Sequence, residues 1–552
     1  MNQIDEIASL EDVQNYLIKT QPYGSGGIFG FYVSSDAKDS NKNAPHIYAG
    51  PLGIERDYYV KDDEDSKKVK VQYETHVARM FGFLGSDETE AAALAATVVA
   101  METQMAAARL DKVERRDPAK RYNPTAMKGL QSMVSSVNWD AYFKGIGAEG
   151  LDEIIVTDLG YFTALNDLLE NNSIADWKAY LKWTLVDQAA SELTTVMETA
   201  NWDFYSKTLR GAKAQRPLEK RALSRVNRNL GQPLGKLYVA EKFPPIAKEQ
   251  MKELVGNLIK AYTARINNLE WMDASTKEKA IEKLDKFTVK IAYPDEWEDY
   301  SSLMVKEGNT YAENMMAVSD WSLKKNISEI GEPVDKKEWG MPPQTVNAYF
   351  NPLNNEIVFP AAILQPPFYN YTADEAVNYG GIGAVIGHEI SHAFDDSGAR
   401  FDANGNVNNW WTPEDLIEFE NRGNALAEQY SAIEVMDSVY INGKFTLGEN
   451  IGDLGGLLGA YDGLQLFFDE EGRPEDIDGF TAEQRFFMSW ATVWRTLTRP
   501  DALRTQIKTD PHSPGIYRAT QPLKNIDAFY EAFNISEGDA MYLSPDKRVR
   551  IW

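Results

Sequence analysis

The sequence predicts a mainly α-helical protein with a small β component, and three observations lead to this fold class. Apolar residues recur at helical spacing through much of the first 310 residues, whereas a strand–turn–strand pattern occurs only at residues 346–359. The length of 552 residues allows a sizeable core and about two to four domains. No internal repeat or low-complexity tract is present, which argues against a solenoid or a disordered chain.

Three helices are predicted in the first part of the chain. A capping box that starts at Asp87 begins an alanine-rich helix over residues 87–110. Apolar residues on one face predict a second helix over residues 251–269. Another capping box, at Ser275, begins a third helix over residues 275–287. We interpret all three apolar faces as core packing.

The character of the sequence changes at Val346. Two strands are predicted at residues 346–350 and 356–359, joined by an asparagine-rich turn. A glycine-dotted apolar helix is predicted at residues 382–393, and a second helical stretch opens at Leu447.

We therefore expect a boundary near residues 310–340. It separates a mostly helical domain, residues 1–310, from a second domain, residues 311–552, and we expect the two to exchange segments.

Composition excludes several classes of function. A net charge of −26 and a pI near 4.7 argue against nucleic acid or anionic lipid as the main partner, because both require a basic face. The absence of cysteine excludes disulfides, thiol catalysis and thiolate metal sites.

The N-terminus shows no secretion signal, and no segment is long and apolar enough to span a membrane. If a leader has been lost, we expect a periplasmic or envelope location, and otherwise a cytoplasmic one.

One short motif carries a specific chemistry. Residues 388–392 read His-Glu-Ile-Ser-His, and residues four apart on a helix share a face, so His388 and His392 can hold one zinc ion. Glu389 then lies beside the metal and can take a proton from its bound water. With only five histidines in the chain, chance would produce this motif roughly 0.004 times.

A catalytic zinc needs a third protein ligand and an open position. The metzincin extension requires Gly at 395 and His at 398, but Asp395 and Gly398 stand there, so that subclass is excluded. Glu449 and Asp453 share a helix face further along. One of them can bind the metal while the other supports a histidine, and the residues alone leave both assignments open.

The last histidine lies in a polar segment near the C-terminus. His512, fixed by a carboxylate such as Asp510, could stabilise charge on a tetrahedral intermediate. Arg518 could hold a substrate carbonyl or carboxylate. A plain surface loop is the alternative interpretation.

The chain resembles the neprilysin-like gluzincin metallopeptidases, the family of endothelin-converting enzyme and bacterial oligopeptidase O. The matching blocks are NAYFNPLNNEIVFPAAILQPPF, NYGGIGAVIGHEISHAFDDSGARFD, LGENIGDLGG, DPHSPGIYR and YLSPDKRVRIW. Weaker likeness upstream, at RNLGQPLGKLYV and WMDASTKEKAIEKL, extends the match over nearly the whole chain. The resemblance implies a two-lobed fold, with a thermolysin-like catalytic domain and a helical lid domain enclosing a chamber.

The resemblance also implies a role for each matching residue. It implies one Zn²⁺ per chain, held by His388, His392 and Glu449. It further implies that Glu389 is the general base, that Asp453 orients His388 and Asp395 supports the zinc site, and that His512, held by Asp510, stabilises the transition state. Substrate would be bound through its backbone by Asn347 and Ala348 and through a carbonyl oxygen by Arg518. The pocket for the residue after the scissile bond would be lined by Ile363, Phe368, Val385, Val493 and Trp494.

The expected function is therefore a zinc endopeptidase that cuts oligopeptides on the amino side of bulky hydrophobic residues. The expected partners are peptide substrates and a missing N-terminal segment of the same protein, because family chains usually have about a hundred further residues ahead of the segment that matches Met1. Three alternatives remain. They are a catalytically silent binding or adhesion protein, a gluzincin aminopeptidase, and a fragment that needs its missing N-terminal part for activity.

Overall fold

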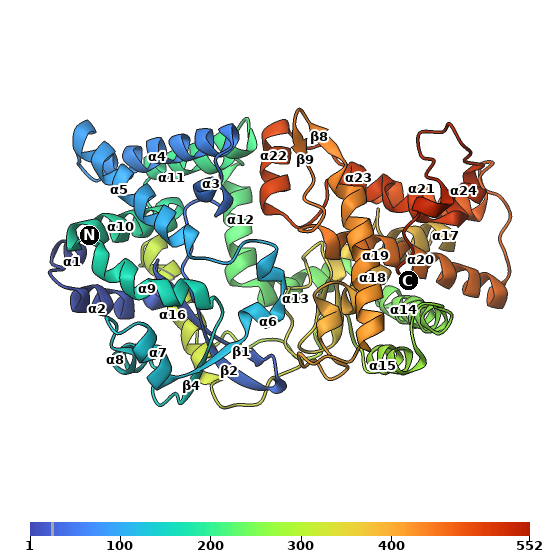
Figure 1. Ribbon diagram of the computed structural model, residues 1–552, viewed down its shortest axis with the longest axis horizontal. Helices are drawn as coiled ribbons and strands as arrows, with labels where there is room; N and C mark the ends of the chain where they lie inside the picture. Colours follow the sequence, from blue (N-terminus) through green and yellow to red (C-terminus); the bar gives the residue numbers. More distant parts are fainter. Residues whose placement is uncertain (24–26) are drawn as a thin grey trace.

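Helices dominate the computed structural model, which describes residues 1–23 and 27–552, and they form two lobes with separate hydrophobic cores (Figure 1). The predicted fold class, mainly α with a small β component in two lobes, is confirmed.

The N-terminal lobe surrounds a core rich in aromatic side chains. Its helices are α1 (Asn2–Asp5), α2 (Leu10–Thr20), α3 (Asp57–Val60), α4 (Glu64–Phe83), α5 (Glu88–Ala107), α6 (Pro118–Arg121), α7 (Met127–Met133), α8 (Trp139–Ile146), α9 (Leu159–Asn171), α10 (Ile174–Ala189) and α11 (Thr195–Trp202). The sequence analysis missed a four-stranded sheet in this lobe, with strand order β1-β2-β4-β3. Its strands are β1 (Phe29–Asp36), β2 (Asp39–Ala49), β3 (Asn123–Ala126) and β4 (Glu153–Val156).

The second lobe carries the histidine motif. Its helices are α14 (Pro245–Asn267), α15 (Ala274–Asp285), α17 (Glu375–Asn378), α18 (Ala384–Ser391), α19 (Pro413–Ser431), α20 (Leu447–Glu471), α21 (Ala482–Val493), α22 (Pro500–Thr509), α23 (Gly515–Thr520) and α24 (Asp527–Phe533). Its three-stranded sheet has the order β5-β7-β6, from β5 (Thr288–Ala292), β7 (Glu356–Pro360) and β6 (Tyr349–Asn351), and β8 (Glu434–Met436) pairs with β9 (Val439–Tyr440). Helices α12 (Leu218–Asn229) and α13 (Gly231–Lys242) lie between the lobes in Figure 1.

Segments cross between the lobes in both directions. Helices α14 and α15 and strand β5 supply residues to the core of the second lobe, although they precede residue 310. Helix α16 (Tyr311–Ser328) follows residue 310, but it lies against β1 in the first lobe (Figure 1). The functional boundary near residues 310–340 stays a prediction.

Two of the three early helices agree with the sequence analysis. Helix α5 begins after Asp87, whose side chain accepts a hydrogen bond from the backbone N–H of Glu90. Helix α14 contains all but the last two residues of the predicted second helix. The predicted cap at Ser275 is wrong, because α15 starts two residues earlier, after Asp273. The backbone N–H of Asp273 donates to the Asp415 carboxylate, so a tertiary contact sets this helix start.

The first predicted strand near the histidine motif is shorter than expected. Strand β6 begins at Tyr349, which pairs with Val358 of β7, so that Asn347 would face Pro360 in the same register. Proline has no N–H to donate, and the ladder therefore stops before Asn347. Strand β6 pairs with β7 alone and forms one edge of its sheet.

Among the residues the structure describes, no helix is both long and apolar enough to cross a lipid bilayer.

Candidate metal centre and active site

Close packing of α18 against α20 brings the predicted metal ligands together. A Cβ added to Gly387 of α18 would lie 2.6 Å from the carbonyl oxygen of Gly456, and one added to Gly452 of α20 would lie 2.7 Å from the His388 ring. Only glycine permits this approach. Glycines that weaken helix propensity here therefore allow two helices to share one site.

The three predicted ligands meet on the facing sides of these helices. His388 lies on α18, His392 follows directly in a 3₁₀ turn, and Glu449 lies in the first turn of α20. Ligand atoms of the three side chains all lie within 4.8 Å of one another. The Glu449 Oε2 atom is 3.3 Å from His388 Nε2 and 3.5 Å from His392 Nε2.

Carboxylates hold the outer nitrogen of each ligand histidine. His388 Nδ1 lies 2.9 Å from Asp453 Oδ1, and His392 Nδ1 lies 2.8 Å from Asp395 Oδ2. We assign the proton of each ring to Nδ1, because a carboxylate can only accept. Both Nε2 lone pairs then face Glu449 Oε2, a buried carboxylate oxygen that accepts no hydrogen bond from either ring. Such a cluster of three acceptors fits a cation with the ligand preference of Zn²⁺.

Glu389 is buried beside these ligands on α18, with 6% of its surface exposed. Burial raises the pKa of its carboxyl group, and the neighbouring imidazoles lower it by a smaller amount. A carboxylate in such a position can exchange a proton with water at the metal.

The loop between α22 and α23 carries His512 to the same centre. His512 Nε2 is 3.0 Å from Glu449 Oε2, while its Nδ1 lies 2.7 Å from Asp510 Oδ1. Burial would lower the pKa of His512, but hydrogen bonds to Asp510 and Glu449 outweigh burial and raise it to about 9. Ser513 anchors the loop by donating a hydrogen bond to Asn450 on α20.

Arg518 supports the centre from α23. Its guanidinium donates to both oxygens of Asp453, at 2.8 and 2.6 Å, and lies 3.7 Å from the centre of the Trp494 ring. Arg518 thus touches the carboxylate that holds His388. The plain surface-loop interpretation of this segment is not supported, since Arg518 is buried.

The predicted substrate-binding residues belong to the same lobe as this centre, apart from Arg518 described above, and their role stays a prediction. Asn347 is exposed and Ala348 is buried, and both directly precede the edge strand β6. The five predicted pocket residues share the core of the second lobe: Ile363, Val385 and Val493 are buried in it, and Phe368 and Trp494 are partly buried at its margin. The other two histidines lie in the N-terminal lobe, where burial lowers the pKa of His46 to about 4 and of His76 to about 3.

Comparisons with known proteins agree with this geometry. Residues 1–294 match the N-terminal model of peptidase family M13, and residues 347–549 match the model of its catalytic part. The chain belongs to peptidase family M13. It is a zinc metalloendopeptidase, a hydrolase of the neprilysin-like gluzincin type, and family membership favours this class over the silent-protein and aminopeptidase alternatives.

Individual M13 relatives cover almost all of the chain. An endothelin-converting enzyme homolog from Locusta migratoria is 33% identical over 99% of this chain and 76% of its own length. The crystal structure of zinc metalloprotease Zmp1 from Mycobacterium tuberculosis in complex with inhibitor is 41% identical, with a TM-score of 0.96 over 100% of this chain and 84% of that one. The same protein in an open state gives a TM-score of 0.71 over 100% of this chain and 86% of that one.

Two residues at this M13 site were missed by the sequence analysis. The side chain of Arg116, in the N-terminal lobe, reaches the second lobe, which we call the zinc lobe because it carries the predicted zinc ligands. It donates hydrogen bonds to both oxygens of Asp396, at 3.2 and 2.8 Å. Its Nη2 also lies 3.8 Å from Asp395 Oδ2, the carboxylate that holds His392. A basic run at residues 115–121 is visible in the sequence, but nothing in it indicates a partner 280 residues away.

The second missed residue is Lys283 on α15, a lysine with 1% exposure. Its Nζ donates to the carbonyl oxygens of Ala393, Gly398 and Phe401, at 2.7, 2.8 and 2.7 Å. Burial lowers the pKa of Lys283 to about 7, although the charges of Asp395 and Asp402 act in the opposite direction. Lys283 therefore fixes the backbone that directly follows the zinc ligand His392. A lysine on the apolar face of a helix was the signal available in the sequence.

We expect Lys283→Met to lower the free energy of unfolding by about 3 kcal/mol, because three buried carbonyls lose their donor. Zinc affinity should fall as well, since the segment after His392 loosens. Thermal unfolding with and without added zinc measures both effects. The matched control is Lys286→Met, one turn further along and paired with Glu282 at the surface, which should change stability by less than about 0.5 kcal/mol. Equal stability of the two variants would contradict this role for Lys283.

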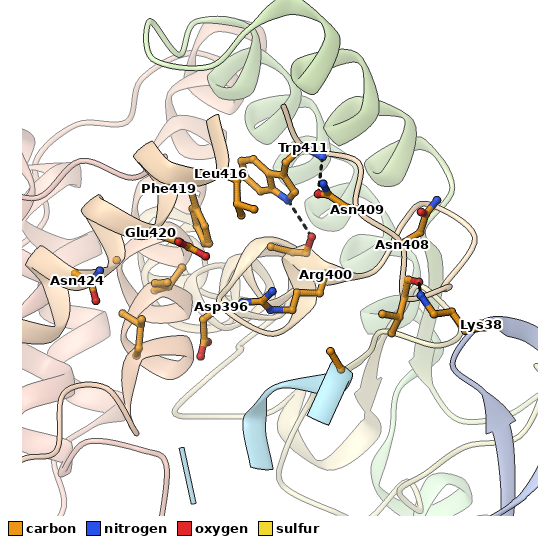
Figure 2. A pocket seen from close by; sticks show the side chains of 16 residues that line it. Lys38, Asp396, Arg400, Asn408, Asn409, Trp411, Leu416, Phe419, Glu420 and Asn424 are labelled. Carbon is orange, nitrogen blue, oxygen red and sulfur yellow. Dashed lines mark hydrogen bonds between the residues drawn. The ribbon is translucent and has the colours of Figure 1, made fainter. Parts of the chain in front are cut away.

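A cavity of about 330 Å³ is lined in part by Asp396, the carboxylate that Arg116 binds (Figure 2). Trp411, Leu416 and Phe419 form its apolar part, and Lys38 reaches it from the N-terminal lobe. The Trp411 indole donates to the carbonyl of Ala399, 2.9 Å away, which keeps the ring beside the segment that follows the zinc ligands.

Proposed function

We propose that this M13 peptidase hydrolyses peptide bonds with Glu389 as general base and then as general acid. Glu389 would take a proton from the attacking water and deliver it to the leaving amine. A Zn²⁺ held by His388, His392 and Glu449 would lower the pKa of that water and polarise the substrate carbonyl. The meeting of these ligands beside a buried Glu389 is the observation that carries the proposal.

The supporting residues would act on the developing charge. His512, whose raised pKa favours the imidazolium form, would donate from Nε2 to the oxyanion, and Asp510 would hold its ring. Asp453 and Asp395 would keep the two ligand imidazoles oriented. We propose that Arg518, in addition to its hydrogen bonds with Asp453, donates a hydrogen bond to a carbonyl oxygen of the substrate.

The open edge of β6 is the proposed docking strand. An extended peptide could pair with the backbone at Asn347 and Ala348, which the fold leaves outside the ladder with β7. Backbone pairing would place peptides of different sequence in the same register along the strand. The pocket at Ile363, Phe368 and Val385 would then select the side chain that follows the scissile bond.

We further propose that the two lobes open and close during turnover. Zmp1 supports this, because this chain matches its inhibitor complex at a TM-score of 0.96 and its open state at 0.71, with 41% identity in both. In the closed arrangement the N-terminal lobe would act as a lid, enclosing the substrate. Short peptides would then be cut, and folded proteins would be excluded.

The decisive experiment compares peptides that differ only in the residue after the scissile bond. We expect kcat/KM for Phe or Leu at this position to exceed that for Ala by tenfold or more, since burying a large apolar side chain contributes about 1.5–3 kcal/mol. Phe368→Ala should reduce this ratio, because Phe368 is a partly buried aromatic side chain of the proposed pocket. A folded control protein should remain intact under the same conditions. Equal rates for Phe and Ala, or rapid cleavage of the folded control, would contradict the proposal.

A further inference from the structure

A second and larger cavity, of about 940 Å³, lies between the two lobes. Its walls come from residues 48–58, 109–121 and 205–210 of the N-terminal lobe and from α22 of the zinc lobe. It extends to Arg116, which contacts the Asp395–Asp396 pair, and to Pro511, the neighbour of His512. The cavity therefore reaches residues that contact or neighbour the active site.

The charge of this cavity is opposite to that of the whole protein. Eight arginine or lysine side chains line it, against two acidic residues, Glu55 and Asp158, whereas the chain as a whole carries a net charge of −26. Both acids are already engaged. Glu55 pairs with Arg115 at 2.8 Å, and Asp158 accepts hydrogen bonds from the backbone N–H groups of Leu110 and Tyr161.

Three of the basic side chains have no carboxylate partner. Arg109, Arg121 and Arg210 form no ion pair within the described residues 1–23 and 27–552. Arg109 lies over the Tyr161 ring, 4.9 Å from its centre. Its Nε and Nη2 atoms are buried and lack a hydrogen-bond acceptor among the described residues. Buried N–H groups without an acceptor are destabilising, so these two atoms of the half-buried Arg109 leave part of its hydrogen-bonding capacity unused.

We infer that this cavity is an anion-binding subsite of the peptidase and selects substrates with Asp or Glu side chains at a distance from the scissile bond. The inference rests on the proposed function and adds a substrate class to it. Arginine binds carboxylates through paired hydrogen bonds, and a cavity with low-dielectric walls strengthens that attraction. The acidic exterior repels such peptides at long range, so the preference should come from retention in the cavity and should be expressed mainly in KM.

The experiment uses C-terminally amidated, quenched fluorescent peptides with one shared core around a Phe cleavage site. Three Glu, Gln or Lys residues are added at either the amino or the carboxyl end, in separate peptides. We expect kcat/KM to fall by about tenfold from Glu to Gln, and again from Gln to Lys, for the end that enters the cavity. Added salt at 0.5 M should reduce these ratios, because it screens charge.

Variants then test whether the cavity causes the preference. Arg109→Gln combined with Arg210→Gln should lower the Glu-to-Gln ratio to about twofold or less. The matched control combines Lys128→Gln with Lys144→Gln, two exposed lysines on α7 and α8 outside the cavity, and should keep the wild-type ratio. If the double variant melts early, Arg210→Gln alone repeats the test, since this side chain is exposed.

Binding provides a readout that does not depend on turnover. Fluorescence anisotropy with the Glu389→Gln protein should show tighter binding of the Glu peptide than of the Gln peptide. Cleavage of the Gln peptide tests the peptidase function by itself. Equal binding and equal kcat/KM of the Glu and Gln peptides, or a ratio that the Arg109 and Arg210 changes leave intact, would overturn the inference.

Discussion

Glu389→Gln should reduce kcat for peptide cleavage by about 10³-fold while zinc stays bound. Glutamine keeps the size and the hydrogen-bonding capacity of the side chain but cannot accept a proton from water. Glu389 is not among the three grouped ligands, so its replacement leaves His388, His392 and Glu449 intact. The loss should therefore appear in kcat, with KM and zinc content close to the wild-type values.

The measurement pairs steady-state kinetics with elemental analysis of zinc. Glu420→Gln serves as the matched control, because Glu420 is an exposed glutamate on α19 that contacts none of the ligands, and its activity should equal that of the wild type. Normal turnover by Glu389→Gln would remove Glu389 from the role of base. Loss of zinc from the variant would show instead that the carboxylate supports the metal site.

The parts of the site that could be predicted from sequence are those encoded by local spacing. The four-residue interval between His388, on α18, and His392, in the 3₁₀ turn that continues it, directs both imidazoles to the same side. The same interval between Glu449 and Asp453 places both on one face of α20, and this explains why the residues alone could not separate ligand from support. Only the family resemblance made that choice.

Long-range contacts could not be predicted, because no local pattern encodes them. Lys283 binds the backbone that follows His392 from a helix more than a hundred residues earlier in the chain, and Arg116 binds Asp396 in the same segment from the other lobe. Helix α15 starts earlier than predicted because the backbone N–H of Asp273 binds Asp415, a residue distant in sequence. Strand β6 was shortened by Pro360 on its neighbour, and this effect becomes visible only when the register of the pair is known.

The fold class could be predicted from the sequence more completely than the order and pairing of the strands. Helical periodicity in α5 and α14 reports apolar faces directly, so the mainly helical character could be predicted. Half of the sheet in the N-terminal lobe escaped detection because β3 and β4 are four residues long, and β4 pairs with β2 in parallel across more than a hundred residues. Strands β1 and β2 are longer and form an antiparallel hairpin, but β2 opens with the polar run at residues 39–43, which lacks the alternation typical of a strand. Short strands with distant partners carry little signal in a single sequence.

Replacing Glu449 and Asp453 in turn should separate the ligand from its support. Glu449→Ala removes one of three grouped ligands, and we expect zinc affinity to fall by about 10³-fold or more, with peptidase activity lost in parallel. Asp453→Asn leaves all three ligands in place and changes only the partner of His388 and Arg518, so affinity should fall by about 10–100-fold. Competition with a chelator of known affinity measures both changes.

The contrast between these two variants tests the assignment itself. If Glu449 is the ligand, high zinc concentrations should restore activity to Asp453→Asn but not to Glu449→Ala, because only the first variant keeps three donors around the metal. The added zinc should also raise the melting temperature of Asp453→Asn more than that of Glu449→Ala, since binding to the folded state alone stabilises it. The opposite order would make Asp453 the ligand and Glu449 the support. Equal rescue of both variants would show that two imidazoles suffice to hold the catalytic ion, and the three-ligand centre would have to be abandoned.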